Sequence, residues 1–302
     1  MRAFLLLFLL GLGLPIGCGR VDFALAGMER VGDAPTAGDD GAGPDGALAG
    51  CTGAFADPML IPELVSGQSE ATFRLTADEL TGVLWSTRGG VIDLYLAERP
   101  DRATPFALSA LTTLNSTANE FDPSIAADGS LIVFASGRPG GDGGLDLYES
   151  IVNNNSFAAP VRLATLGSSA DDHQPYLRGL GELYFVSTRT GLPRIYRATR
   201  TGPGAYQAPT LVSEIGGAEE SDPVPTADGL TLYWSSTRGG DAGNVYRATR
   251  ASLSDPFADV VELGGLTSTS IDAPSWISVD GCRLYMSSDR SGQPHVYLAT
   301  SP

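Results

Sequence analysis

Residues 222–248 read DPVPTADGLTLYWSSTRGGDAGNVYRA, and this stretch decides the fold. Together with the residues that follow, it holds four short apolar pieces: Pro223–Thr226, Leu232–Ser235, Val245–Ala248 and Val260–Leu263. Asp228-Gly229 lies between the first two pieces and favours a tight turn, because Gly adopts a positive φ without steric cost. A Ser-x-Arg triplet followed by Gly marks the next turn. The pattern therefore predicts a unit of four short strands.

The same unit recurs five times along the chain, and three separate marks keep its period of 48–53 residues. The first mark is the last residue of the Ser-x-Arg triplet, at Arg88, Arg138, Arg189, Arg238 and Arg290. The second is the tyrosine of an aliphatic-Tyr pair, at Tyr95, Tyr148, Tyr196, Tyr246 and Tyr297. The third is an aromatic residue at Phe55, Phe106, Phe157, Tyr206 and Phe257. Repeats of this length, built from short strands and turns, predict an all-β, five-bladed β-propeller of four-stranded blades.

The two ends of the repeat region complement each other. Residues 55–64 resemble a fourth strand with no first three before it, whereas the last unit ends after its third strand at Tyr297. If the N-terminal strand completes the last blade, every blade has four strands and no sheet edge stays open at the seam. We therefore expect the propeller over residues 54–302, with approximate repeats 65–115, 116–166, 167–215, 216–266, and 267–302 plus 54–64.

These units resemble the TolB-type propeller repeat. Its pattern is an acidic residue and Pro, then Asp-Gly, an apolar strand, Ser-x-Arg-x-Gly, and a short strand with Tyr. The acid-Pro element is present at Asp122-Pro123 and Asp222-Pro223, while the other three copies have Thr72-Phe73, Gln174-Pro175 and Ala273-Pro274. The resemblance covers residues 54–301. It implies a periplasmic or surface protein that binds partners, although some related propellers are polysaccharide lyases, and it implies the fold more strongly than an activity.

The amino-acid composition excludes some classes of binding partner. The chain has 19 basic and 35 acidic residues and a net charge of −16, which repels phosphate backbones and anionic lipids, so we expect no nucleic-acid partner. Its 42% hydrophobic residues provide a core, and 38 Gly with 20 Pro indicate many turns. We expect a monomer whose partner is an envelope protein or a glycan, and whose only contact with a membrane is an N-terminal lipid.

The first residues resemble an export signal. An apolar run from Ala3 to Leu14 follows Met1-Arg2, as in a secretory signal peptide over residues 1–17. Gly17-Cys18 resembles the cleavage site of a bacterial lipoprotein, although Leu14 lies one place earlier than that pattern requires. Residues 18–53 are rich in Gly, Ala and Asp and predict a disordered tether. The expectation is an outer-membrane lipoprotein with Cys18 lipidated, facing the periplasm or the cell surface; the alternative is a cleaved secretory signal with an incidental Cys.

Two cysteines remain, Cys51 and Cys282, and an exported protein lies in an oxidising compartment. Cys51 precedes the N-terminal strand, and Cys282 begins the second strand of the last unit. If the N-terminal strand closes that blade, both cysteines face one rim, because consecutive strands alternate in direction. The predicted seam therefore predicts a Cys51–Cys282 disulfide; two free thiols, or a bond to another molecule, are the alternatives.

Candidate ligand-facing residues cluster where each unit begins. They are Glu120, Asp122, Asp172, His173, Glu220, Asp222 and Asp272, in predicted loops at the channel mouth on the same face as the Ser-x-Arg arginines. Since acids recur in every unit, one interpretation is architectural, with Arg and carboxylate bridging neighbouring loops. The other is chemistry by carboxylates that break the repeat, because paired acids cleave glycosidic bonds.

No cofactor is expected from the sequence. His173 and His295 are the only histidines and lie in different units, which is too sparse for zinc. Calcium at the acidic mouth is an alternative, because hard cations bind clustered carboxylates, but no loop has calcium-ligand spacing. Two functions therefore remain, a binding scaffold and a carbohydrate-active enzyme (a glycoside hydrolase or polysaccharide lyase), and no catalytic residue is assigned. A scaffold should pair its acids with the repeated arginines, whereas an enzyme should leave two or three unpaired in a deep pocket.

Overall fold

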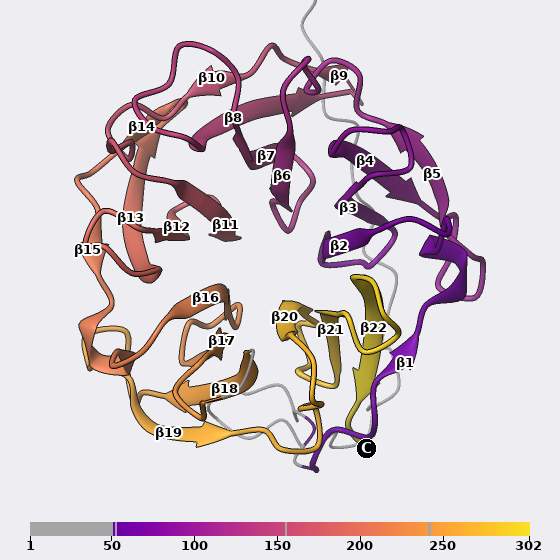
Figure 1. The fold of residues 1–302 in the computed structure, drawn as a ribbon, viewed down its shortest axis with the longest axis vertical. Helices are drawn as coiled ribbons and strands as arrows, with labels where there is room; N and C mark the ends of the chain where they lie inside the picture. The colour runs from indigo at the N-terminus through magenta and orange to yellow at the C-terminus, as the bar shows by residue number, and fades with distance from the viewer. Residues whose placement is uncertain (1–50, 52, 155, 241–242) are drawn as a thin grey trace, which may run out of the picture. The chain divides into compact units, whose positions relative to one another are not determined.

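The computed structural model describes residues 51, 53–154, 156–240 and 243–302, which form five antiparallel sheets around a central axis (Figure 1). This confirms the predicted five-bladed β-propeller of four-stranded blades. The predicted signal peptide, Cys18 and tether residues 18–50 lie outside the described residues. Within the described part, the helices are two short 3-10 turns, η1 (Pro62–Leu64) and η2 (Ser213–Ile215), and none is long and apolar enough to cross a membrane.

Each blade runs from an inner strand next to the axis to an outer strand at the rim (Figure 1). The first blade consists of β2 (Glu70–Leu75), β3 (Thr81–Ser86), β4 (Asp93–Glu98) and β5 (Ala107–Ala110). The second consists of β6 (Glu120–Ile125), β7 (Leu131–Ser136), β8 (Asp146–Asn153) and β10 (Val161–Arg162), with β9 (Ser156–Phe157) also paired to β8.

The remaining blades follow the same order. The third consists of β11 (Asp172–Arg178), β12 (Glu182–Ser187), β13 (Arg194–Gly202) and β14 (Ala205–Tyr206), with β15 (Thr210–Leu211) also paired to β13. The fourth consists of β16 (Glu220–Pro225), β17 (Thr231–Ser236), β18 (Asn244–Thr249) and β19 (Ala258–Glu262). The fifth consists of β20 (Asp272–Ile277), β21 (Arg283–Ser288), β22 (His295–Thr300) and the N-terminal β1 (Met59–Leu60).

The core lies between neighbouring blades. Every residue of β2 and β20 is buried, whereas every residue of the outer strand β19 is exposed. Aromatic rings join adjacent sheets: Phe73 of the first blade meets Tyr285 of the fifth edge-on, with ring centroids 5.7 Å apart. Burial of both faces explains the near-continuous apolar sequence of a middle strand such as β7, LIVFAS.

The inner strands begin earlier than the sequence predicts. The fourth starts at Glu220 and not at Pro223, and the acids assigned to loops are the opening residues of strands. The reason is a β-bulge at the acid-Pro position, where the residue adopts a left-handed conformation: φ is 55° at Thr72, 52° at Asp122, 50° at Gln174 and 51° at Asp222. Each strand resumes its pairing beyond the bulge. A bulge bends the strand and redirects a side chain, and sequence periodicity does not report it.

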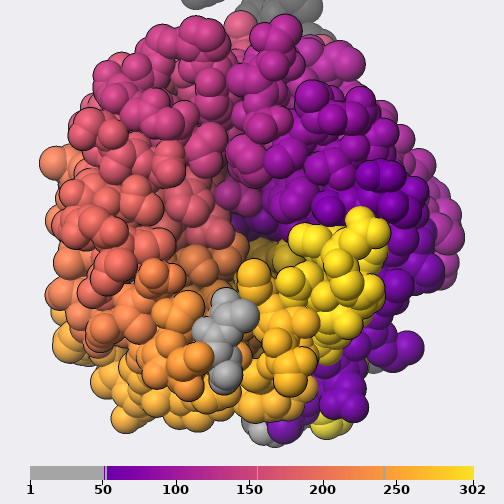
Figure 2. Space-filling view, in the orientation of Figure 1, coloured from indigo at the N-terminus to yellow at the C-terminus, as the bar shows by residue number. Residues whose placement is uncertain are grey.

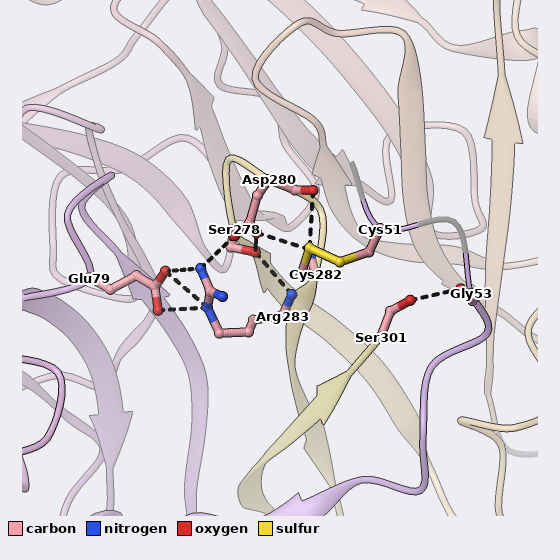
Figure 3. Close-up of a disulfide and its surroundings, with 8 residues drawn as sticks. All are labelled: Cys51, Gly53, Glu79, Ser278, Asp280, Cys282, Arg283 and Ser301. Atoms are coloured by element: carbon pink, nitrogen blue, oxygen red, sulfur yellow. Dashed lines mark hydrogen bonds and ion pairs between the residues drawn. A yellow bond between two sulfur atoms is a disulfide. The ribbon is translucent and has the colours of Figure 1, made fainter. Parts of the chain in front are cut away.

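The seam closes as predicted. β1 pairs antiparallel with β22, Met59 opposite Leu298 and Leu60 opposite Tyr297. Backbone hydrogen bonds from Ala56 to Thr300 (2.8 Å) and from Ile61 to Val296 (3.0 Å) extend this short ladder. The predicted Cys51–Cys282 disulfide is also present, with the two Cα atoms 5.1 Å apart (Figure 3).

An ion-pair cluster around Glu79 joins the first blade to the fifth blade, next to the same seam. Glu79 is at the turn position that Gly occupies in three other blades, and it adopts a φ of 63° although it is not glycine. Its buried carboxylate accepts hydrogen bonds from Arg283 of the fifth blade, the shortest at 2.7 Å (Figure 3). Arg102 and Arg99 lie 3.4 and 4.0 Å from the same carboxylate. The strain of a left-handed glutamate is thus offset by a charged contact between the first and last blades.

Candidate functional site

The Ser-x-Arg arginines form a repeated contact in all five blades, which we call the arginine ring. Each arginine donates from Nη2 to the carboxylate that opens its own blade's inner strand. The pairs are Arg88–Glu70 (3.3 Å), Arg138–Glu120 (3.2 Å), Arg189–Asp172 (2.7 Å), Arg238–Glu220 (2.7 Å) and Arg290–Asp272 (2.6 Å). The same nitrogen also donates to a carbonyl in the connection that enters the blade, such as that of Leu114 for Arg138 (2.6 Å). The ring therefore fixes each incoming connection to its own blade, and each arginine–carboxylate pair lies within one blade. Glu70 alone among these carboxylates also contacts a histidine of a neighbouring blade, with His295 Nδ1 of the fifth blade 3.0 Å from its Oε2.

Four of the seven candidate residues belong to this ring. Glu120, Asp172, Glu220 and Asp272 are at most 1% exposed, and their charges are matched by arginine. None of the four lines the central cavity described below. A buried carboxylate with a charge-assisted partner in every blade serves the architecture, because removing either member leaves an uncompensated buried charge.

The other three candidates lie nearer the axis. A cavity of about 170 Å³ is lined by the residue just before the proline position in each blade: Thr72, Asp122, Gln174, Asp222 and Ala273. Figure 2 shows a recess where the blades meet at the centre of the face in view. The bulges described above turn the first four of these residues toward the cavity. In the fifth blade the proline comes one place earlier after the opening acid, the register shift lies between Pro274 and Trp276, and the blade has no left-handed residue here.

The two cavity aspartates have different environments. Asp122 accepts a hydrogen bond from Thr72 Oγ1 (2.9 Å), and its Oδ2 lies 3.7 Å from His173 Nδ1. Burial alone would raise the pKa of Asp122, but the nearby His173, with Arg74 and the hydrogen bond from Thr72, holds it below its usual value. Burial and the nearby charge of Asp122 instead raise the pKa of Asp222 to about 6. Burial opposes protonation of His173, yet its contact with Asp122 leaves its pKa raised.

Arg74 lies across the channel as an internal plug. It is 1% exposed and extends from β2 of the first blade, donating from Nε to the Ser275 carbonyl of the fifth blade (3.2 Å) and from Nη1 to the Pro175 carbonyl of the third. Its guanidinium stacks 5.1 Å from the centre of the Tyr176 ring. Burial lowers the pKa of Arg74, while Asp122 and Asp222 oppose that shift. One arginine thus faces two carboxylates of the cavity and contacts two other blades.

This arrangement can bind or polarise a ligand that carries hydroxyl groups. One carboxylate is ionised across the neutral range and the other changes charge near pH 6, with an amide and a hydroxyl beside them. Environments that push two carboxyl pKa values apart suit one to accept and the other to donate a proton. Among the described residues, no group of three or more His, Cys, Asp or Glu side chains is placed to hold a metal ion.

The aspartates should respond oppositely to amide substitution. Because the pKa of Asp222 is raised, the folded protein favours its neutral form. The cost of ionising this carboxyl in the fold grows from the unfolded pKa up to about pH 6 and is complete above that. D222N should therefore raise Tm at pH 8 and leave it nearly unchanged at pH 4. Asp122 has a lowered pKa and stabilises the fold above its unfolded pKa, so D122N should lower Tm at pH 7, with a smaller difference in acid. Calorimetry across pH tests both; the same sign for the two variants at pH 8 would contradict these assignments.

Sequence reasoning missed Thr72, Gln174 and Arg74. Thr72 and Gln174 are noticed as departures from acid-Pro, but only the bulge places them beside Asp122 and Asp222. Arg74, in contrast, is visible in the sequence when the five copies are aligned. It is the charged residue at an inner-strand position where the next three blades have Ser124, Tyr176 and Val224.

Comparison with known proteins finds similar folds among solved structures. No family model matches the chain, and no curated protein sequence matches it. Among solved structures, a putative TolB from Agrobacterium tumefaciens is 15% identical over 78% of this chain and 79% of that chain, with a TM-score of 0.50. An endo-arabinase from Bacteroides thetaiotaomicron is 14% identical over 82% and 97%, with a TM-score of 0.54. TolB from Acinetobacter baumannii is 16% identical over 84% of this chain, which spans 65% of that protein, with a TM-score of 0.48. At these identities the likeness is one of fold: the chain is a five-bladed β-propeller whose structural neighbours include a putative TolB and an endo-arabinase.

Proposed function

We propose that this chain is a binding scaffold of the bacterial envelope, and that its central cavity recognises a glycan or protein partner through Asp122, Asp222 and Gln174. One observation supports this most. The arginine ring repeats the same contact in every blade, whereas the cavity presents a different side chain from nearly every blade. A contact that repeats in every blade stabilises the fold. Side chains that differ from blade to blade around one cavity are suited to recognise one asymmetric ligand. A cavity of 170 Å³ is below the roughly 300 Å³ of drug-sized sites, so it fits a single sugar unit or a polar side chain.

A carbohydrate-active enzyme is the second candidate, favoured by the split pKa values of the two aspartates. In that function Asp222 would donate a proton near pH 6 while Asp122 stays ionised, the division of labour that glycosidic cleavage requires. The match to a solved endo-arabinase supports the fold alone. For this reason we place binding first.

One experiment separates the two. Purified wild type, D122N, D222N and E98Q are applied to a glycan array and then incubated with any retained glycan while reducing ends are measured. Glu98 is exposed, so E98Q is a matched change of charge away from the cavity. Binding without cleavage, lost at least about tenfold in D122N and D222N but kept in E98Q, is the result expected for a glycan-binding scaffold.

Cleavage that disappears in D222N would establish the enzyme instead. If the wild type retains no glycan, the same four proteins are crosslinked in envelope membranes. A crosslinked protein that is kept by E98Q and lost in D122N and D222N supports a protein partner. A crosslinking pattern identical in all four proteins would remove the cavity from recognition.

The envelope location belongs to the same proposal and rests on Cys18, Gly17 and the export-dependent disulfide. Radiolabelled palmitate should enter the full-length protein and not C18A, because only a thiol at the mature N-terminus accepts the lipid. Wild type should sediment with outer membranes, and C18A should be released in soluble form. Equal labelling of both proteins would refute lipidation at Cys18.

A further inference from the structure

The fourth blade breaks a pattern that the other four share. In those blades a serine lies four residues before the ring carboxylate, and its hydroxyl donates to it: Ser66 to Glu70, Ser116 to Glu120 (2.5 Å), Ser168 to Asp172 (2.8 Å) and Ser268 to Asp272 (2.7 Å). In the fourth blade this position is Gly216, four residues before Glu220. The exception therefore removes one hydrogen-bond donor from a buried carboxylate.

The missing donor leaves polar atoms without partners. Glu220 Oε1 receives Arg238 Nη2 at 2.7 Å, but the buried Oε2 has no hydrogen-bond partner. The indole Nε1 of Trp234 is also buried without a hydrogen-bond partner. Both this N–H and the Ala218 backbone N–H lie close enough to Glu220 to oppose the rise in its pKa that burial causes. At the equivalent position the second and third blades have Phe134 and Phe185, which carry no such donor. An unpaired acceptor and an unpaired donor lie together, and a hydroxyl group can satisfy both.

A cavity opens directly onto this place. It measures about 320 Å³ and lies between the third and fourth blades, away from the central cavity. Its polar lining includes Glu220, Arg194 and Ser213, and its apolar walls include Leu192 and Leu211, which are 45% and 43% exposed. Gly216 and Gly217 form the side next to Glu220.

Arg194 supplies a second unused binding group. It opens β13 and lines the cavity, and its side chain makes no hydrogen bond or ion pair with any other described residue. Its Nη1 lies 3.1 Å from where a Cβ on Gly216 would be, so the guanidinium extends over the glycine. Glu220 is already neutralised by Arg238, and Arg194 therefore gives the cavity a net positive charge suited to a monoanion.

We propose that this cavity binds a hydroxylated carboxylic acid, a sugar acid such as a uronate. A ligand hydroxyl takes the place of the missing serine hydroxyl against Glu220 Oε2, and the carboxylate pairs with Arg194. The apolar face of the ring packs on Leu192 and Leu211. This site goes beyond the function proposed above, because it uses neither the central cavity nor Asp122 or Asp222.

The indole N–H of Trp234 provides a local readout. The chain has three Trp residues, so ¹H–¹⁵N spectra contain few indole signals, and that of Trp234 is assigned with W234F. D-galacturonate and D-glucuronate should each shift this signal saturably, with a midpoint near 1 mM, a typical weak affinity. D-galactose lacks the carboxylate and acetate lacks the hydroxyls, so at equal concentration and ionic strength each should give less than about a tenth of that shift.

Two variants test the assigned contacts. G216S restores the repeat's own hydroxyl to Glu220. Its new Cβ meets the flexible end of Arg194 at 3.1 Å and the Ser213 carbonyl oxygen at 3.3 Å, and the φ of −76° at this position is one that serine adopts. It should fold and abolish the uronate response, while R194Q should weaken binding at least about tenfold. G264S is the matched control, since a Cβ there meets no atom within 4 Å, and it should respond like the wild type.

The proposal is overturned if neither uronate moves the Trp234 signal, if galactose or acetate moves it equally, or if G216S retains the full response. These outcomes are independent of D122N and D222N, which should leave the uronate response unchanged whether or not the central cavity binds a glycan.

Discussion

The double substitution C51S/C282S is expected to lower the free energy of unfolding by about 5 kcal/mol, the largest effect we expect of any change outside the core. The disulfide joins residues that are 231 positions apart and connects the N-terminal segment to the last blade. Without it, the unfolded chain regains the entropy of a loop that spans almost the whole propeller, while the folded state keeps the short β1 ladder and the Glu79–Arg283 contact to hold the seam. Urea unfolding followed by tryptophan fluorescence measures the loss.

Two controls separate the crosslink from the loss of two side chains. The wild type treated with a thiol reductant should match C51S/C282S, and the reductant should not alter the double variant. If the oxidised wild type and the variant have the same urea midpoint, then the seam is held by β1 and the Glu79 cluster, and the disulfide contributes nothing to stability.

Replacing the channel plug should have the next largest effect. We expect R74M to lower the free energy of unfolding by about 3–5 kcal/mol, the usual cost of breaking a buried charged network from one side. Methionine preserves much of the volume but loses the bonds to the Ser275 and Pro175 carbonyls and leaves Asp122 and Asp222 without their shared cation. The loss should be larger at pH 8 than at pH 5, because Asp222 is charged only above its pKa of about 6.

R102M is the matched control, because Arg102 is 54% exposed and its contact with Glu79 should contribute less than about 1 kcal/mol. The combined variant R74M/D122N/D222N should recover part of the stability lost in R74M, since the carboxylates it leaves uncompensated are gone. Equal losses in R74M and R102M, or no recovery, would show that Arg74 acts through packing and not through its charge.

The parts of this structure that repeat were predictable from the sequence. Three marks with one period define the blades, and counting strands at the two ends predicts both β1 on the last blade and the Cys51–Cys282 bond. The start of each inner strand was not predictable, because a left-handed residue such as Asp222 interrupts the alternation on which strand prediction depends. The arginine–carboxylate pairing could be anticipated, but not that each pair would lie within one blade.

Positions where one copy departs from the repeat carry information that the repeat period alone does not give. Aligning the five copies exposes Arg74 as a charge in a strand interior and Gly216 as a glycine in a serine column. Neither the alignment of the copies nor the composition gives the distances between residues of different blades. Only the fold shows that Arg74 reaches two other blades and that the serine lost at Gly216 leaves Glu220 Oε2 unpaired beside a cavity.

The position of Cys51 also has a mechanical consequence. Tension applied along the chain from the N-terminal side reaches Cys51 before it reaches β1, and the disulfide transfers it to Cys282 at the edge of β21. The force then passes into a strand hydrogen-bonded on both sides, in the register Arg283–Thr300 and onward, and the short β1 ladder is bypassed. Pulled from that end, the oxidised propeller would resist extension as a closed ring, whereas the reduced protein would unzip from β1 inward.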